Sequence, residues 1–336
     1  MLWMLAAILI CGASVFTACS SNDDNPFQPV VQVGIDKTNF PDDNFWNYLL
    51  EQDYGKDGVL TEAEIRNITV MDVSEKEIKS LKGIEYFTAL RTLNCSDNEL
   101  TELDISGNTA LDTLDCSYNE LTALDVSKNT ALRSLDCGIN ELTALDVSKN
   151  TALTVLRCAN NELTSLDLSV NKALTKLSCD ENKLTALDIS KNTALTRLSC
   201  SGNSLTSLDI SKNTALQLLQ CSGNDLTALD VSANTSLVYM ACDSNQLATL
   251  DLSKNMALNK LLCCNNQISG QNMDALIGSL RQNESEEFCA FYVMDGNEPN
   301  QNVCTKSQAA AAKAKGWLPQ YWDEDEEVWL EYEGSE

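Results

Sequence analysis

The sequence contains no histidine among its 336 residues. This absence excludes Ser-His-Asp triads, imidazole general bases and histidine-ligated metal sites. Basic residues are also scarce, because 23 Lys and Arg stand against 49 Asp and Glu, which gives a formal net charge of −26. A chain this acidic repels the phosphates of nucleic acids, so we expect no nucleic acid partner.

An apolar segment occupies residues 1–16 and ends in "FTAC", in which Ala18 precedes Cys19. The segment is too short to span a membrane as a helix and is typical of a targeting signal. The Ala-Cys junction resembles a bacterial lipobox. The resemblance implies a lipoprotein signal peptide over residues 1–18 and a lipid on Cys19, while ordinary secretion after cleavage at Ala18 is the alternative.

The residues after Cys19 are polar and begin with "SSNDDN". This stretch resembles the serine-and-acid tag of lipoproteins that Bacteroides-like bacteria export to the outer face of the outer membrane. The resemblance implies an outer membrane lipoprotein exposed at the cell surface, held to that membrane through the lipid on Cys19. We expect residues 19–34 to form a polar tether.

A unit of 21 residues then repeats nine times. Its first half reads L-x-x-L-x-C-x-x-N-x-L, and its second half follows L-T-x-L-D-V-S-x-N-T-A. The units begin at Leu90, Leu111, Leu132, Leu153, Leu174, Leu195, Leu216, Leu237 and Leu258. This is the leucine-rich repeat pattern, and a looser unit with Val73 at the cysteine position extends it over residues 68–269.

The spacing within a unit predicts the architecture. In "LRTLNC" the residues alternate, so Leu93 and Cys95 point inward while Thr92 and Asn94 point outward from a short strand. One unit cannot bury its apolar edge alone, but stacked units bury a continuous core and form a parallel sheet. We therefore expect an α/β repeat solenoid, curved, with a parallel concave sheet.

One cysteine recurs in every unit, at Cys95, Cys116, Cys137, Cys158, Cys179, Cys200, Cys221, Cys242 and Cys263. This ladder resembles that of internalin J-type surface proteins of bacteria. Buried free thiols are favoured, because a disulfide needs Cβ atoms about 3.8 Å apart, whereas parallel neighbours stand about 4.8 Å apart. An array of disulfides or metal sites is the alternative, and pairing among Cys264, Cys289 and Cys304 is left open.

Asparagine and aspartate also recur in columns. We expect the inward amides of Asn98 to Asn266 to pair with backbone groups where the chain leaves the strand, and Asn108 to Asn255 form a second column. The column from Asp104 to Asp251 points outward. A solvated face partly offset by nearby lysines is favoured for it over a calcium-binding rail.

The outward strand positions are where the units differ from one another. They change from small and acidic residues through a basic centre to an apolar end. The predicted ligand-binding residues of this concave face are Arg157, Lys176, Arg197, Leu218, Tyr239 and Leu262. Cations beside an aromatic residue suit an acidic or sugar-bearing ligand, and unselected surface variation is the alternative.

A possible calcium loop precedes the repeats, within an N-terminal cap over residues 35–67. The segment "DYGKDGVLTEAE" resembles an EF-hand loop. The calcium ligands that it implies are Asp53, Asp57, the Val59 carbonyl, Thr61 and Glu64. Gly55 stands where an Asp or Asn ligand is usual, so one ligand is missing. A calcium-supported or vestigial cap is favoured over a signalling EF-hand, because no other segment resembles a second, paired hand.

After residue 269 the pattern changes, and we expect an α+β C-terminal cap over residues 270–336. Met273, Leu276 and Ile277 share one face of a predicted helix, "FCAFYVMD" reads as a strand, and a second helix is capped by Thr305. The tryptophans and tyrosines that end the chain fit the core of this cap, with a sugar platform as the alternative. The caps, lipobox and repeats together resemble leucine-rich repeat lipoproteins of Bacteroides-like bacteria.

These features predict a surface-anchored binding or adhesion protein, not an enzyme, whose concave sheet recognises a protein or a glycan. Calcium in the N-terminal cap is the one cofactor that the sequence suggests. The alternatives are a carbohydrate-active enzyme that uses Asp115 and Asp136, and a structural surface-layer component. The enzyme is disfavoured because an open sheet gives two carboxylates little enclosure from water.

Overall fold

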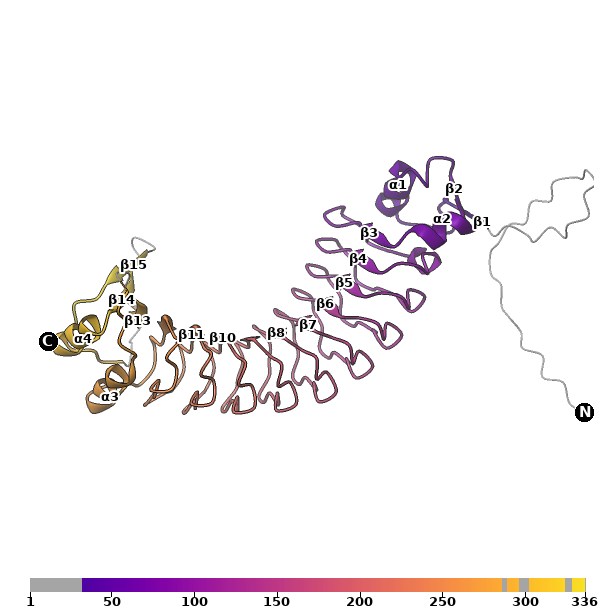
Figure 1. The fold of residues 1–336 in the computed structure, drawn as a ribbon. Coiled ribbons are helices and arrows are strands. Elements are labelled where there is room, and N and C mark those ends of the chain that lie inside the picture. Colours follow the sequence, from indigo (N-terminus) through magenta and orange to yellow (C-terminus); the bar gives the residue numbers. More distant parts are fainter. Residues whose placement is uncertain (1–31, 286–288, 296–301, 324–327, 336) are drawn as a thin grey trace, which may run out of the picture.

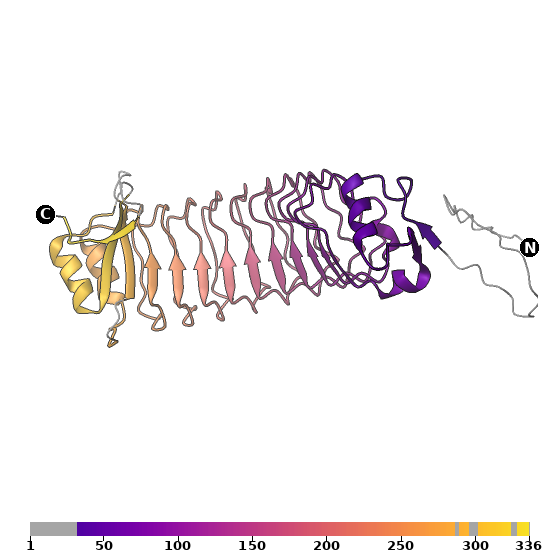
Figure 2. The same ribbon diagram turned by 90° about the horizontal axis from the view of Figure 1, so that it is seen from above.

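The chain folds into a curved solenoid whose coils stack along one axis (Figure 1). The computed structural model describes residues 32–285, 289–295, 302–323 and 328–335. Strands β3 to β15 form a single 13-stranded sheet in chain order, and only β14 and β15 pair antiparallel within it. Figure 2 shows the strands side by side along the concave face. The prediction of a leucine-rich repeat solenoid with a parallel sheet is confirmed.

Each repeat contributes one strand of three residues. After β3 (Val70–Asp72) these strands are β4 (Thr92–Asn94), β5 (Thr113–Asp115), β6 (Ser134–Asp136), β7 (Val155–Arg157), β8 (Lys176–Ser178), β9 (Arg197–Ser199), β10 (Leu218–Gln220), β11 (Tyr239–Ala241) and β12 (Lys260–Leu262). The central residue is buried in each, as with Leu177, which is 2% exposed. Equivalent residues of neighbouring units pair in register, for example Lys176 with Arg197. Side chains of one column therefore stack directly on one another.

The nine ladder cysteines are buried free thiols without exposed surface. Several thiols donate to a carbonyl of the next coil, as Cys179 Sγ does to the Ser199 oxygen at 3.6 Å. Burial raises the pKa of every ladder thiol, that of Cys158 to about 12. The thiols therefore stay protonated at neutral pH and act as small apolar packing groups, as the sequence predicts.

The two asparagine columns bind the backbone of adjacent coils, which confirms the prediction for the first of them. In that column, Asn161 donates through Nδ2 to the carbonyls of Cys137 and Cys158, at 3.0 and 3.2 Å. Its Oδ1 accepts the Leu142 N–H at 2.9 Å. In the second column, Asn150 donates to the carbonyls of Val126 and Asn129, at 3.0 and 2.9 Å. These amides satisfy backbone groups that would otherwise be buried without partners.

The N-terminal cap is built from β1 (Gln32–Gly34), α1 (Asp43–Glu51), β2 (Val59–Thr61) and α2 (Glu62–Asn67), and a short 3₁₀ helix, η1 (Ile84–Tyr86), precedes the first regular unit. The predicted tether, residues 19–34, is wrong at its end, because β1 pairs antiparallel with β2 and Val33 is only 9% exposed. Phe40, which has no exposed surface, contacts Phe45 and Phe87 at ring-centroid distances of 5.7 and 6.3 Å. These rings join the cap to the first coils.

The C-terminal cap consists of α3 (Gln271–Ser279), β13 (Cys289–Asp295), α4 (Lys306–Ala314), β14 (Trp317–Asp323) and β15 (Val328–Glu331). Thr305 caps α4 through a reciprocal pair of hydrogen bonds with Gln308, as the sequence predicts for this helix start. The predicted boundary at residue 270 is not a boundary of the sheet, because β13 pairs in parallel with β12. The cap therefore lengthens the concave face as well as covering the last coil.

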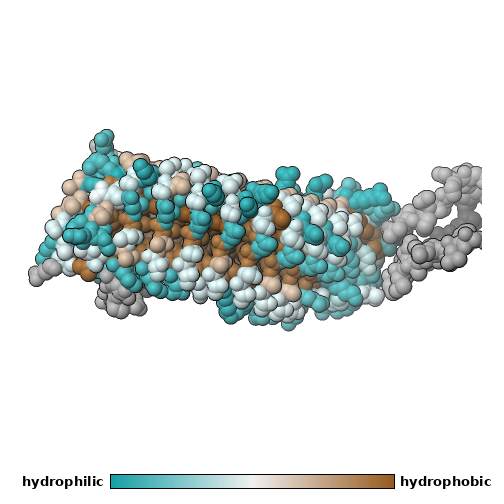
Figure 3. All heavy atoms as spheres, turned by 90° about the horizontal axis from the view of Figure 1, so that it is seen from below, coloured by the Kyte–Doolittle hydropathy of each residue, from teal (hydrophilic) through white to brown (hydrophobic). Residues whose placement is uncertain are grey.

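Figure 3 shows an apolar band along the face that lies away from the sheet. Within the described residues, no helix combines the length and the apolar character that crossing a membrane requires.

The thiol ladder predicts a large difference in reactivity between the folded and the unfolded protein. In the native state at pH 8, an alkylating reagent should leave the nine ladder cysteines unmodified, because they are buried and their pKa values are raised. In denaturant without reductant, all nine should react. Peptide mass spectrometry after alkylation measures both states, and a ladder cysteine that reacts only after reduction would contradict the assignment.

Candidate functional site

The predicted ligand-binding residues fall into two groups on the concave face. Arg157, Lys176, Arg197 and Leu218 line one hollow of about 480 Å³, which we call the cationic hollow. Its remaining lining residues are Leu156, Leu177, Ser178, Asp180, Ser199, Ser201 and Gln220. The structure thus brings the three predicted cations around a shared space.

An aspartate that the sequence analysis missed lies in the cationic hollow. Asp180 accepts hydrogen bonds from the hydroxyls of Ser178 and Ser199, at 2.7 and 2.5 Å, and from the Ser201 N–H at 2.9 Å. It follows the ladder cysteine, a position that holds Ser, Gly or Ala in most other units. That departure from a column of small residues is the signal that would have identified it.

The three cations differ in how far they are already neutralised. Arg157 lies 3.6 Å from Asp136, measured from Nη1 to Oδ2. Lys176 and Arg197 are exposed and make no ion pair with any other residue that the structure describes. Lys176 and Arg197 are therefore the two cations of the hollow that are available to an anionic ligand.

Asp115 and Asp136, the pair named for the alternative enzyme function, occupy equivalent positions on β5 and β6. Asp115 accepts the N–H and the hydroxyl of Ser117, at 3.1 and 2.6 Å. Burial raises the pKa of Asp136, and the nearby Asp115 charge adds to this effect while Arg157 opposes it. Neither carboxylate lines the cationic hollow, so that hollow does not enclose a carboxylate pair.

Tyr239 and Leu262, the other two predicted residues, lie beyond the cationic hollow toward the C-terminal cap. The Lys260 ammonium lies 5.4 Å from the centroid of the Tyr239 ring and 5.2 Å from that of Tyr292. Tyr292 pairs in register with Leu262, so both belong to the outward positions of the sheet.

The aromatic group continues into the cap. The Tyr292 and Trp329 rings lie 4.3 Å apart, and Trp329 and Trp322 lie 5.4 Å apart, both edge to face. We call Tyr239, Tyr292, Trp322 and Trp329 the aromatic cluster. All four are half-buried, whereas Trp317 has no exposed surface and belongs to the cap core. The cluster could not be predicted from the sequence, because its members lie on strands that only the continued sheet brings together.

Backbone packing explains why the EF-hand-like loop has Gly55 at the position of the missing ligand. A Cβ at Gly55 would lie 1.8 Å from the Leu49 carbonyl oxygen, so the close backbone approach permits only glycine there. Gly58, at the sharp turn of the loop, has φ +78°. Both glycines serve the turn between α1 and β2.

The predicted calcium ligands do not converge in the folded loop. Asp53 pairs with Lys56 at 2.5 Å, and Asp57 accepts the Val59 N–H at 3.1 Å. Glu64 accepts the Thr61 N–H and hydroxyl, both at 2.8 Å, and so caps α2. Within the described residues no group of three or more acidic, cysteine or histidine side chains could hold a metal ion. As folded, these side chains do not fit a bound ion.

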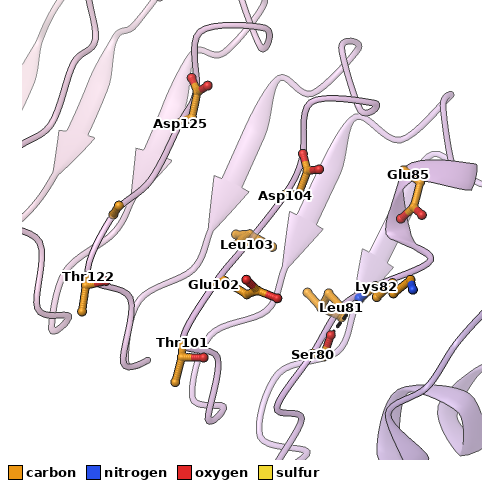
Figure 4. A pocket seen from close by; sticks show the side chains of 11 residues that line it. Ser80, Leu81, Lys82, Glu85, Thr101, Glu102, Leu103, Asp104, Thr122 and Asp125 are labelled. Carbon is orange, nitrogen blue, oxygen red and sulfur yellow. Dashed lines mark hydrogen bonds between the residues drawn. The ribbon is translucent and has the colours of Figure 1, made fainter.

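The outward aspartate column serves the turns of the second half-repeat. Figure 4 shows Asp104 and Asp125 beside a hollow of about 740 Å³, on segments that pass in front of the strands. Asp104 accepts the Ser106 N–H at 2.9 Å, and Asp125 accepts the Ser127 N–H at 2.8 Å. Hydrogen bonds from the hydroxyl and N–H of Ser106 lower the pKa of Asp104, and those from the N–H and hydroxyl of Ser127 lower the pKa of Asp125. The column thus stabilises turns, and among the described residues its members form no metal-binding group.

The structure is similar to leucine-rich repeat proteins of known structure. The functional domain of InlJ from Listeria monocytogenes, described as including a cysteine ladder, matches with a TM-score of 0.69 and 35% sequence identity. The match covers 81% of this chain and 60% of that one, so this chain spans less than two thirds of that domain. No protein-family model matches the sequence, and no curated protein does.

Two more distant matches also share the repeat architecture. The leucine-rich repeat domain of APL1B matches at 26% identity with a TM-score of 0.57, over 68% of this chain and 72% of that one. The plant peptide hormone receptor RGFR1, solved in complex with RGF2, matches at 22% identity with a TM-score of 0.55, over 68% and 41% of the two chains. At this identity the receptor supports the fold alone.

The calcium prediction is tested by Glu64→Gln, which keeps a hydrogen-bonding cap on α2 but removes the carboxylate. If the loop binds calcium, the ion should raise the melting temperature of the wild type and of the control Glu62→Gln, but not that of Glu64→Gln. Differential scanning calorimetry with calcium and with a chelator measures this. Equal responses in both variants would contradict the site, and no response in the wild type would leave the loop as a structural cap.

Proposed function

We propose that this leucine-rich repeat solenoid with a cysteine ladder is a binding or adhesion protein that engages a protein or glycan ligand through its concave face. The observation that carries the proposal is the cationic hollow. It gathers Arg157, Lys176 and Arg197 on a chain with a formal net charge of −26. A local patch of opposite charge attracts a ligand that the rest of the surface would repel.

Packing gives an independent reason for this choice of surface. The inward columns of leucine, cysteine and asparagine are dictated by burial and by hydrogen bonding between coils. Most outward strand positions are less buried than the inward columns, and they carry most of the differences between units. A curved sheet with such freedom suits recognition of an extended ligand.

A non-enzymatic role is part of the proposal. Asp115 and Asp136 lie one strand apart on the open sheet, where water reaches them. Asp136 is held near Arg157, and Asp115 accepts hydrogen bonds from Ser117. Asp136 is partly buried, but both carboxylates lie on the open concave sheet, which gives a glycosidic bond little enclosure from water.

The location follows from the N-terminal sequence, which lies outside the described residues. The resemblance of the Cys19 segment to a lipobox, and of "SSNDDN" to an export tag, supports an outer membrane lipoprotein with its solenoid at the cell surface. A surface location would expose the concave face to ligands outside the cell.

The recognition surface is tested by replacing Arg157, Lys176 and Arg197 together with Ser. Binding to a partner found on a protein and glycan array should fall about tenfold or more, because hot-spot contacts are removed. The cost in stability should stay near 1 kcal/mol, since only Arg157 leaves an ion pair. The control replaces Lys149, Lys191 and Lys212 with Ser, an equal change of charge in turns off the sheet. Unchanged binding by the first variant would move the site elsewhere.

The anchor is tested by Cys19→Ala. This variant should leave the membrane fraction, because an acyl chain contributes about 0.8 kcal/mol of membrane affinity per buried methylene and the variant cannot be acylated. Cys11→Ala is the control, since Cys11 lies within the apolar segment and is not the lipobox cysteine. Fractionation followed by immunoblotting measures the distribution. A Cys19→Ala protein that stays in membranes would rule out the anchor.

A further inference from the structure

We propose that the concave face binds an anionic polysaccharide, whose acid groups lie on Lys176 and Arg197 and whose sugar rings reach the aromatic cluster. The inference rests on the proposed function, since it names the ligand class for the same face. It joins two features that lie side by side on the sheet, the cationic hollow on β7 to β10 and the aromatic cluster on β11 to β15.

The outward positions form a regular row along the solenoid. The first outward residues of five successive strands, paired in register, are Lys176, Arg197, Leu218, Tyr239 and Lys260. Adjacent strands lie about 4.8 Å apart, so Arg197 and Lys260 stand about 14 Å apart along the row. A sugar ring in an extended polysaccharide is about as long as one strand spacing. A linear polymer of sugar rings can therefore place one ring over each strand.

The cationic end offers both charge and hydroxyl-binding groups. Lys176 and Arg197 are exposed, and the structure shows no ion-pair partner for either within its described residues. The hydroxyls of Ser178 and Ser199 donate to Asp180, which leaves their lone pairs to accept hydrogen bonds from a ligand. The ligand's acid groups are therefore expected beside Lys176 and Arg197, and its hydroxyl groups are expected near Asp180.

The same arrangement argues against a purely acidic peptide. Asp180 would repel a carboxylate that entered the hollow beside it. A polysaccharide carries many hydroxyls for each acid group, so it can place an acid at Lys176 and Arg197 and hydroxyls at Ser178 and Ser199. A peptide of consecutive glutamates carries an acid group on every residue, so it cannot place acid groups at the cations and hydroxyls beside Asp180.

The aromatic end suits sugar rings for a different reason. Tyr239, Tyr292 and Trp329 are half-buried side chains of β11, β13 and β15 in the same sheet, and Trp329 contacts Tyr292 edge to face. Aromatic rings offer apolar faces with polar groups at their edges, which matches a sugar ring with C–H groups on its faces and hydroxyls around its rim. Lys260 places a further cation between the two tyrosines, within reach of a second acid group.

Matched polymers test the ligand class on the purified full-length protein. Polygalacturonate is compared with its methyl ester, and dextran sulfate with dextran, by biolayer interferometry at physiological salt. We expect binding to at least one acidic polymer and at least tenfold weaker binding to its neutral counterpart. Preference for the carboxylated or the sulfated polymer identifies the acid group. Polyglutamate serves as the acidic peptide probe and should bind more weakly than the preferred polysaccharide.

Two double variants separate the halves of the site. Lys176→Ser with Arg197→Ser should weaken polysaccharide binding about tenfold and reduce its dependence on salt, because it removes the charged contacts. Tyr239→Ala with Trp329→Ala should also weaken binding about tenfold, but with the salt dependence kept. The matched controls are Lys149→Ser with Lys191→Ser, and Tyr118→Ala at an exposed tyrosine in a turn. Thermal melts establish that every variant is folded.

Three results would overturn the inference. The first is equal binding of neutral and acidic polymers, and the second is polyglutamate binding that matches the polysaccharide and ignores the aromatic variant. The third is a lack of binding to any acidic polysaccharide while an array partner still requires Arg157, Lys176 and Arg197. In that third case the proposed concave-face function stands and only the ligand class is wrong.

Discussion

Hydrogen bonds that pass from each coil to the next are the constraint on which the solenoid depends. A strand of three residues cannot satisfy its own backbone, so it pairs on both sides with strands of neighbouring units. Where the chain leaves the strand, Asn161 takes over by binding the carbonyls of Cys137 and Cys158. The same amide recurs in every unit, and this need explains why inward positions hardly vary while outward ones do.

The outward positions differ between units, and along the concave face they change from acidic to cationic to aromatic side chains. Acidic residues such as Asp136 are partly neutralised by Arg157, and the cations that follow are left available. The aromatic cluster occupies the far end because the C-terminal cap continues the sheet. Capping and recognition therefore share residues here, since Tyr292 and Trp329 belong to strands that also close the solenoid.

The sequence predicts what depends on local spacing and misses what depends on contacts between distant segments. The burial of Leu177 and Cys179 follows from alternation within one strand, and the capping of α4 by Thr305 follows from a pattern four residues long. By contrast, β1 pairs with β2 across a separation of more than 20 residues, and the sequence of the predicted tether does not identify β2 as its partner. Asp180 was missed for the same reason, and Trp329 was assigned to the cap core with a sugar platform as the alternative, because the contacts of both residues depend on neighbours on other strands.

In-register pairing of equivalent residues has a consequence for how such a chain can evolve. Lys176 pairs with Arg197 in the same register in which Arg197 pairs with Leu218. The contact between two neighbouring repeats is therefore the same along the solenoid. Recombination between two repeats of the gene would therefore delete or duplicate whole coils without creating a new kind of contact in the interior. Each such event would shift the outward residues past one another and change their order. The core is preserved by its periodicity, while the order of side chains along the concave face remains open to selection.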